Sequence, residues 1–182
     1  MNEIRIINSN ASTKVQIIND LMEIEKAVYE EEYRGEFDPI KARFEKFPEM
    51  FILAYDGDKL IGYFCWFPIS KSLHDRILTD KALFDDDISP NDVVSIGKDN
   101  YVYIISTAIL PKYQNNNTGT EMMQRFFQIL RANNKKGLKT LDVLTSVISE
   151  EGERLVRSNG FIMAEDRVGN GYKLYRLEGD RL

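Results

Sequence analysis

The chain has 182 residues, of which 43% are hydrophobic and 29% are charged, and its formal net charge is -5. A chain of this length and composition can bury a core of ordinary size, so we expect a single domain over residues 1–182. The acidic balance argues against a nucleic-acid-binding protein. No apolar run approaches the length of a membrane-spanning helix, and the polar start Met1-Asn2-Glu3 is unlike a signal peptide. We therefore expect a cytoplasmic protein without nucleic-acid or membrane partners.

A single cysteine, Cys65, and a single histidine, His74, limit the chemistry that the chain can support. One cysteine excludes an internal disulfide, and one histidine leaves no cluster of soft or imidazole ligands, so we expect no metal site. Cys65 lies in an aromatic segment, which favours a packed thiol over the nucleophile of a cysteine hydrolase. His74 falls in a presumed loop, and no third member of a catalytic triad accompanies it.

Hydrophobic periodicity and turn residues predict alternating strands and helices along the whole chain. Strands are expected at residues 3–8, 50–55, 60–67, from 101 onward, 139–147, 161–166 and 172–177. Helices are expected at residues 14–32, 38–47, from 118 onward and 149–159. Asp38 is the expected cap of the second helix, with Pro39 at its first position.

Residues 70–100 form an extended loop segment in this reading, with a short helix predicted at residues 70–78. The segment also carries the acidic run Asp85-Asp86-Asp87, with Asp92 close by. An acidic loop beside an acyl donor would attract a cationic amine. The competing and favoured interpretation is a solvated charged loop without a substrate role.

An apolar strand that begins at Tyr101 runs into a small-polar loop, and the loop opens a helix. Backbone N–H groups of such a loop and of the first helical turn lack intrachain partners, and the helix dipole adds about half a positive charge. The junction is therefore a candidate seat for a phosphate group. Thr118 and Glu121 have the spacing of a capping box, which predicts that the helix begins at Thr118.

The loop from Gln114 to Gly119 resembles the coenzyme A-binding loop of the GNAT N-acetyltransferase superfamily, which reads Arg/Gln-x-x-Gly-x-Gly/Ala. Gln114 and Gly119 match this pattern, whereas Asn117 stands where the family has its first glycine. Asparagine tolerates left-handed backbone angles better than most residues, so this departure is physically mild. Farther along, residues 149–161 resemble the family's helix that ends in Gly-Phe, here Gly160 and Phe161.

The resemblance implies an α/β GNAT acyl-CoA N-acyltransferase fold, a mixed central sheet flanked by helices, across nearly the whole chain. It implies transfer of an acetyl group from acetyl-CoA, as cosubstrate, to a primary amine of a small molecule or peptide, and it allows a homodimer. The alternative is a non-enzymatic CoA-binding or sensory module of the same fold. Carried over by position, the residues that bind the cosubstrate are Thr107, Ala108, Ile109, Gln114, Asn115, Asn116, Asn117, Thr118, Gly119, Thr120 and Ser149.

The usual acid and base of the family are both replaced in this chain. Tyr103 stands where many members carry a glutamate as general base, and Val156 stands where many carry a tyrosine as general acid. Tyr103 is therefore the one catalytic candidate, although a phenol with a reference pKa of about 10 is a poor base near neutral pH. A packed strand aromatic is the favoured interpretation of Tyr103, and a helix cap that of Ser149.

Overall fold

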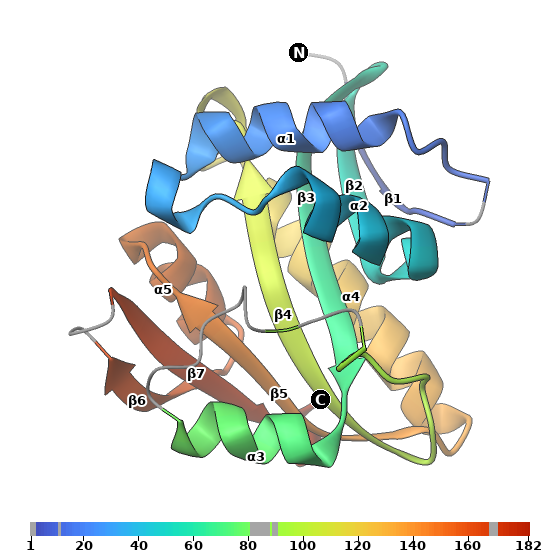
Figure 1. Ribbon diagram of the computed structural model, residues 1–182, viewed down its shortest axis with the longest axis vertical. Coiled ribbons are helices and arrows are strands. Elements are labelled where there is room, and N and C mark those ends of the chain that lie inside the picture. Colours follow the sequence, from blue (N-terminus) through green and yellow to red (C-terminus); the bar gives the residue numbers. More distant parts are fainter. Residues whose placement is uncertain (1–2, 11, 81–87, 89–90, 168–170) are drawn as a thin grey trace. The chain divides into compact units, whose positions relative to one another are not determined.

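The computed structural model describes residues 3–10, 12–80, 88, 91–167 and 171–182, which form a seven-stranded sheet with flanking helices (Figure 1). The strands are β1 (Ile4–Asn8), β2 (Phe51–Asp56), β3 (Lys59–Ile69), β4 (Asp99–Ile109), β5 (Lys139–Val147), β6 (Ile162–Arg167) and β7 (Tyr172–Glu178). The α-helices are α1 (Ile17–Val28), α2 (Phe37–Lys46), α3 (Lys71–Thr79), α4 (Thr118–Lys135) and α5 (Glu150–Ser158). Short 3-10 turns lie at Glu31–Tyr33, Pro48–Met50, Pro111–Tyr113 and Gly179–Arg181.

The sheet is mixed, as the sequence predicted, and its strand order is β1-β2-β3-β4-β5-β7-β6. Strands β1, β2 and β3 pair antiparallel, whereas β4 pairs with β5 in parallel. Strand β7 then pairs antiparallel with both β5 and β6. The hairpin between β2 and β3 turns at Gly57, whose φ of 61° lies in the left-handed region that suits glycine.

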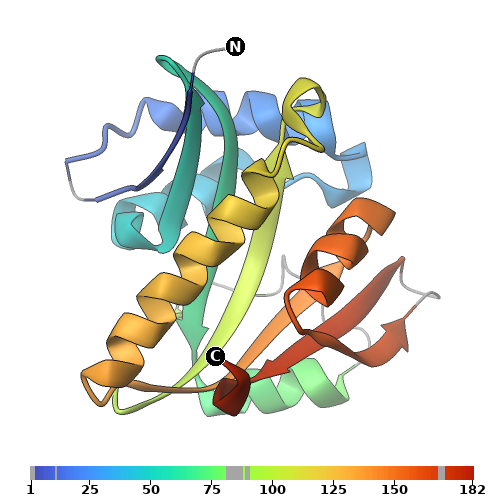
Figure 2. The same cartoon turned by 180° about the vertical axis from the view of Figure 1, so that it is seen from behind.

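The chain forms two compact units, and their boundaries pass through β3, β4 and α4. Unit 1 consists of Met1–Cys65 and Ser106–Phe126, and unit 2 of Trp66–Ile105 and Phe127–Leu182. In unit 1, α1 and α2 cover one face of the strands, and the first half of α4 covers the other (Figure 1, Figure 2). The ring of Phe44 on α2 packs 5.0 Å from that of Phe51, and Phe64 packs 5.2 Å from Phe126 on α4.

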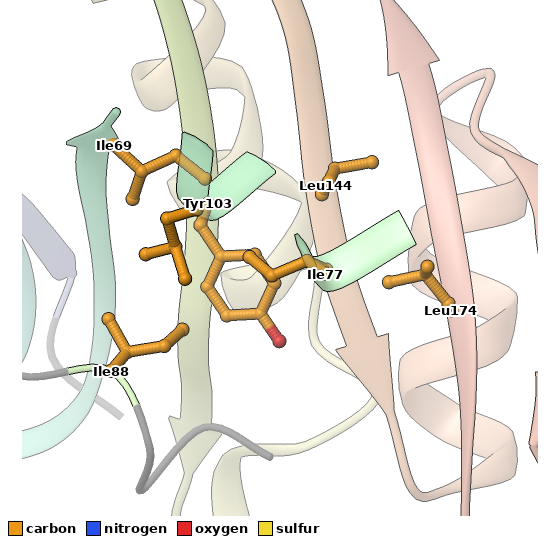
Figure 3. Close-up of a cluster of buried hydrophobic side chains, with 7 residues drawn as sticks. Ile69, Ile77, Ile88, Tyr103, Leu144 and Leu174 are labelled. Carbon is orange, nitrogen blue, oxygen red and sulfur yellow. The ribbon is translucent and has the colours of Figure 1, made fainter. Parts of the chain in front are cut away.

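The core of unit 2 surrounds Tyr103 on β4 (Figure 3). Buried aliphatic side chains from α3, from the neighbouring strands and from Ile88, which lies between α3 and β4, complete this cluster: Ile69, Leu73, Ile77, Ile88, Leu144 and Leu174. The predicted short helix is therefore confirmed as α3, and its amphipathic face explains why it packs on the sheet. The hydroxyl of Ser70 caps α3 by accepting the N–H of Leu73 at 3.1 Å.

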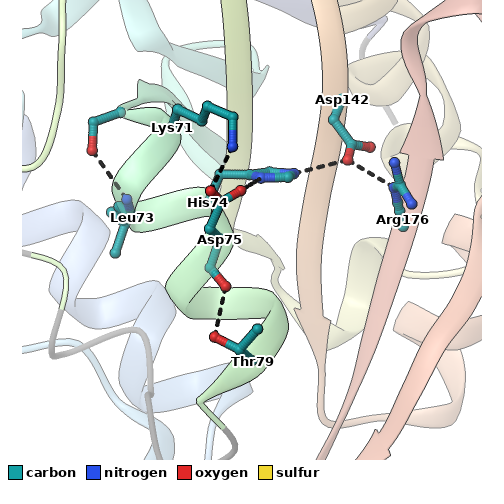
Figure 4. A network of polar contacts seen from close by, with 8 residues as sticks. Lys71, Leu73, His74, Asp75, Thr79, Asp142 and Arg176 are labelled. Atoms are coloured by element: carbon teal, nitrogen blue, oxygen red, sulfur yellow. Dashed lines mark hydrogen bonds and ion pairs between the residues drawn. The ribbon is translucent and has the colours of Figure 1, made fainter.

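His74 lies on α3 and is buried, which corrects its expected place in a loop. Its Nε2 lies 2.8 Å from Asp142 on β5, and its Nδ1 lies 3.1 Å from Asp75 (Figure 4). Asp142 is only 2% exposed, and it also accepts from Nε of Arg176 on β7 at 2.7 Å. A buried carboxylate that is paired in this way is costly to unpair, so the three side chains fasten α3 to two strands.

Two predicted helix starts are corrected by the structure. Helix α1 begins at Ile17 rather than at residue 14 and ends at Val28, because Tyr29 is already extended. Helix α2 begins at Phe37, so Asp38 lies in its first turn and does not cap it. The N–H groups of a first helical turn have no intrahelical acceptor, so Pro39 fits anywhere in that turn and does not mark its first position.

The predicted acidic run at residues 85–87 lies outside the described residues. Among the helices that the structure describes, none is both long and apolar enough to cross a bilayer.

Candidate functional site

The loop that follows β4 is tied to its strand and to a neighbouring hairpin within unit 1. The side chain of Gln114 donates from Nε2 to the carbonyl of Ile109 at 2.9 Å. The hydroxyl of Tyr113 donates to the Asp56 carboxylate at 2.8 Å. The loop backbone is thus held in one arrangement at the point where β4 ends, which pre-organises its N–H groups for a ligand.

Two asparagines of this loop adopt left-handed backbone angles: φ is 64° at Asn115 and 67° at Asn117. Asn117 therefore adopts the left-handed conformation that made its replacement of the family's first glycine physically mild. Asparagine is one of the few non-glycine residues that reach this region at modest cost. Left-handed residues of this kind occur in anion-binding loops, where they help to turn backbone N–H groups toward one concave side.

Helix α4 begins at Thr118 as predicted, but Thr118 does not form the predicted capping box. The N–H of Glu121 donates to the carbonyl of Asn117 at 2.9 Å, so Asn117 is the N-cap. The Thr118 hydroxyl donates instead to Oδ1 of Asn116 at 2.5 Å. The N–H groups of Gly119 and Thr120 lie in the first turn, before any intrahelical acceptor is available, and can therefore serve a bound anion.

Gly62 on β3 lets the backbone approach closely at the end of β4. A Cβ added there would lie 2.9 Å from the carbonyl oxygen of Ala108 and 3.1 Å from a side-chain carbon of Ile109. The N–H of Leu110 donates to the carbonyl of Ile61 at 2.9 Å, which anchors this part of the strand. Unit 1 thus brings together the backbone of residues 107–109 and the loop of residues 114–120, which the sequence predicted to share a ligand.

Ser149 belongs to unit 2 and caps α5, where its hydroxyl accepts the N–H of Gly152 at 3.1 Å. Its predicted contact with the cosubstrate stays a prediction. At the other end of α5, Gly160 has a φ of 88°, and Phe161 donates its N–H to the carbonyl of Val156 at 3.2 Å. This is a Schellman ending, so the predicted Gly-Phe helix stop is confirmed.

Tyr103 is 2% exposed and sits within the buried cluster of unit 2 (Figure 3). Its hydroxyl lies 2.7 Å from the hydroxyl of Ser146. This environment is that of a packed strand aromatic, and the catalytic role of Tyr103 stays a prediction.

Unit 1 also contains a chain of hydrogen bonds that sequence reasoning missed. The carboxylate of Glu25 on α1 accepts the hydroxyl of Tyr63 on β3, and the hydroxyl of Ser106 on β4 donates to Tyr63 at 3.0 Å. The hydroxyl of Tyr29 lies 3.1 Å from that of Ser106 and donates to the carbonyl of Thr107 at 3.2 Å. The chain therefore ends at a residue that was predicted to bind the cosubstrate.

The sequence did carry one signal for this chain of hydrogen bonds. Glu25 follows Leu21 by four residues and therefore falls on the apolar face of α1. A carboxylate on a buried helix face needs partners, because burying an unpaired charge is costly. The hydroxyl that it accepts, however, belongs to Tyr63 on β3, 38 positions farther along the chain, and Tyr63 in turn meets Ser106 on β4.

Burial shapes the acidity of this region. Burial, followed by the charge of Glu25, raises the pKa of Tyr63 well above its ordinary value. Burial also raises the pKa of the Cys65 thiol, while the charge of Arg43 lowers it. Cys65 is thus a packed, protonated thiol, as the sequence predicted.

A surface hollow of about 470 Å³ lies in unit 1 directly after Tyr29 in sequence, and it is lined by Glu30, Glu31 and Glu32. All three side chains are exposed. Their charges make this part of the surface attractive to cations.

Comparisons with known proteins agree with this arrangement. Residues 16–161 match the model of the acetyltransferase (GNAT) family. The structure resembles the loading GNATL domain of CurA from Lyngbya majuscula, with a TM-score of 0.77, 15% identity and all of both chains covered. It also resembles the PaiA N-acetyltransferase of Thermoplasma acidophilum solved with coenzyme A, with a TM-score of 0.58, 14% identity and 97% and 99% of the two chains covered.

A third similar structure is the ribosomal-protein-S18-alanine N-acetyltransferase of Escherichia coli, with a TM-score of 0.60, 12% identity and 97% and 94% coverage. No curated protein matched the sequence. At these identities the solved structures establish the fold alone, whereas the family model covers more than half of the chain. The chain therefore belongs to the acetyltransferase (GNAT) family.

Proposed function

We propose that this protein transfers an acetyl group from acetyl-CoA to a primary amine of a small molecule or peptide. The observation that carries the proposal is the loop before α4, where left-handed residues at Asn115 and Asn117 lead into a helix N-terminus. Such a loop presents N–H groups to the phosphates of a nucleotide-like ligand. Family membership supplies the expected ligand, which is an acyl-CoA.

In this proposal most of the donor site consists of backbone. The N–H groups of residues 114–120 hold the pyrophosphate, and those of Thr107, Ala108 and Ile109 pair with the pantetheine arm and the thioester oxygen. Holding donor and acceptor in the right orientation supplies much of the rate enhancement, because oriented reactants avoid the entropy cost of encounter.

The acceptor in this proposal arrives as a cation, because a primary amine is protonated near neutral pH. The hollow lined by Glu30, Glu31 and Glu32 supports this, since three exposed carboxylates favour an ammonium group over an anionic acceptor. These residues directly follow Tyr29, whose hydroxyl contacts the carbonyl of Thr107.

Thermal unfolding with added ligands tests the donor site. Acetyl-CoA should raise the melting temperature of the full chain, because a ligand that binds only the folded state stabilises it in proportion to occupancy. Dephospho-acetyl-CoA, isobutyryl-CoA and free adenosine serve as comparison ligands. A larger shift with acetyl-CoA than with isobutyryl-CoA supports acetyl specificity. No shift with any CoA ester at millimolar concentration would remove the proposal.

Transfer itself is measured by the release of free CoA thiol from acetyl-CoA in the presence of one amine at a time. Putrescine, tyramine and a peptide with a free N-terminal alanine represent cationic, aromatic and peptide acceptors. Thiol release that depends on one of these amines, with the acetylated amine detected by mass, supports the enzyme.

The second candidate function is a CoA-binding or sensory module without transferase activity. Replacement of both usual acid and base groups, by Tyr103 and Val156, favours this alternative. A module of this kind shows the melting shift with CoA but no thiol release with any amine. The two measurements together therefore separate the two functions.

A further inference from the structure

We propose that four side chains of unit 1 form a proton relay that takes a proton from the acceptor amine: Tyr29, Ser106, Tyr63 and Glu25. The inference rests on the proposed acetyl transfer and names the groups that perform its proton removal. Tyr29 contacts the amine and is the catalytic residue of the relay. Ser106, Tyr63 and Glu25 act through it.

Each hydroxyl of the relay has one hydrogen, and the hydrogen of Tyr29 has two acceptors within reach, the Ser106 oxygen at 3.1 Å and the Thr107 carbonyl at 3.2 Å. When Tyr29 donates to Ser106, all hydrogen bonds of the relay point toward Glu25. Tyr63 donates to Oε1 of Glu25, and Ser106 donates to Tyr63 at 3.0 Å. The Ser106 oxygen is then left as an acceptor for the hydroxyl of Tyr29 at 3.1 Å. With Tyr29 turned toward Ser106, every member donates to the next, and a proton can pass inward along these hydrogen bonds.

The two ends of the relay differ in exposure. Glu25 and Tyr63 are each 2% exposed, whereas Ser106 and Tyr29 are half-buried. The acceptor amine can therefore meet the relay at Tyr29, while the carboxylate that receives the proton stays out of water. Thr107, which accepts from Tyr29 at 3.2 Å, belongs to the backbone segment proposed to hold the thioester.

The surroundings of Glu25 fit a proton acceptor with a fixed position. Its Oε2 accepts the N–H of Gly35 at 2.7 Å, and its Oε1 accepts the hydroxyl of Tyr63. Arg43 on α2 and Cys65 on β3 are ionisable groups of the same region, since the charges of Arg43 and Glu25 both act on the Cys65 thiol. Tyr63 keeps its proton because burial raises its pKa, so it passes a proton on without remaining as a phenolate.

The proton balance of the step is complete. The N–H bond of the ammonium breaks and the proton goes to the Tyr29 oxygen, while the Tyr29 proton goes to Ser106. The Ser106 proton goes to Tyr63, and the Tyr63 proton ends on Glu25. The neutral amine then attacks the thioester carbon, the C–S bond breaks, and the second amine proton leaves with the CoA thiolate as a thiol. After product release, Glu25 returns its proton to solvent by the same route.

The test is the pH dependence of acetyl transfer by the full chain. The probes are acetyl-CoA and whichever of putrescine, tyramine or the alanine peptide gives the fastest thiol release. The variants are Glu25→Gln, Tyr29→Phe and Ser106→Ala. Tyr175→Phe is the matched control, because it removes the hydroxyl of another tyrosine that donates to a glutamate, Glu153, at 2.7 Å in unit 2.

The kcat of the wild type should stay close to its maximum at pH values well below the pKa of the amine. Each relay variant should lose about a hundredfold in kcat near neutral pH, and its rate should rise tenfold per pH unit toward the amine pKa, because only the neutral amine then reacts. The KM for acetyl-CoA should change by no more than about twofold. The control should keep the wild-type profile, and Ser106→Thr, which restores a hydroxyl, should recover most of the loss.

Melting temperature with acetyl-CoA reports whether each variant folds. If Glu25→Gln does not fold, the pair Ser106→Ala and Ser106→Thr decides the question, because it changes one small half-buried side chain. Wild-type transfer with an unchanged pH profile in Ser106→Ala and Tyr29→Phe overturns the relay and leaves the proposed function intact. Absence of transfer by the wild type with every probe overturns the proposed function and the relay together.

Discussion

Asn117 replaces the glycine of the family's loop and keeps the conformation that the glycine serves. Its φ of 67° would strain a β-branched residue, for which the left-handed conformation costs about 1–2 kcal/mol. As the N-cap, its carbonyl also accepts the first intrahelical N–H of α4, from Glu121. The geometry of the loop therefore depends on what the backbone of this residue can adopt, and little on its amide group.

We expect Asn117→Gly to bind acetyl-CoA within about threefold of the wild type, because glycine adopts the same angles without strain. Asn117→Val should bind at least about tenfold more weakly, since the strain of the left-handed conformation would displace the loop. Isothermal titration of both variants with acetyl-CoA measures the difference. Equal affinities would mean that the loop does not bind through its backbone.

Tyr103 contributes packing and one hydrogen bond at the centre of unit 2. Tyr103→Phe should keep turnover within about threefold, because general acid–base catalysis would contribute about a hundredfold or more. The free energy of unfolding should fall by about 1 kcal/mol, since the hydroxyl of Ser146 loses its partner. Ser146→Ala removes the same bond from the other side and should cost a similar amount. A hundredfold loss of kcat in Tyr103→Phe alone would make Tyr103 catalytic.

Helix α5 is fastened to β7 by a polar cluster around Glu153. Lys173 donates to one oxygen of this carboxylate at 2.6 Å, and the Tyr175 hydroxyl donates to the other at 2.7 Å. Arg157 lies one turn farther along α5, with its Nε 3.0 Å from Glu153. The hydrogen bonds from Lys173 and Tyr175 lower the pKa of Glu153 from its ordinary value of 4.5.

A carboxyl group whose pKa is lower in the folded than in the unfolded protein stabilises the fold above the unfolded pKa. This contribution is lost as the pH falls from 4.5 through the lower folded value. Glu153→Gln should therefore melt below the wild type at neutral pH, and the two melting temperatures should converge as the pH falls below 4.5. Glu150→Gln is the control, because Glu150 lies on the same helix with a side chain that is 90% exposed. A difference that persists unchanged at low pH would contradict the assignment.

At the scale of the molecule, the chain crosses between the two compact units within β3, within β4 and within α4. When the part of a strand or helix in one unit unfolds, the part of the same element in the other unit loses hydrogen bonds. Units that share elements should therefore unfold together. We therefore expect calorimetry to give one transition with equal calorimetric and van't Hoff enthalpies, as for the single domain predicted from the sequence. Two resolved transitions would show that the units are independent.

Local residue patterns were sufficient for much of this fold. The bounds of β5, the start of α4, the Ser149 cap and the left-handed residues Asn117 and Gly160 were all predictable, because each depends on a few neighbouring residues. Helix α1 was predicted too long, since the prediction ran on past its last apolar residue, Val28, into the glutamate run that follows Tyr29, where the chain is already extended. Apolar spacing alone cannot locate such an end.

The sequence by itself determined the order of the elements, the loop chemistry before α4 and the family to which the chain belongs. Only the tertiary structure brought Glu25, Tyr63, Ser106 and Tyr29 into one chain of hydrogen bonds, and His74 onto Asp142. The physical reason is that backbone conformation follows from nearest neighbours, whereas a hydrogen bond between distant side chains depends on strand register and on how each helix packs on the sheet. A polar residue on an apolar face indicates that a hydrogen-bond partner is needed, and the tertiary structure determines which residue that partner is.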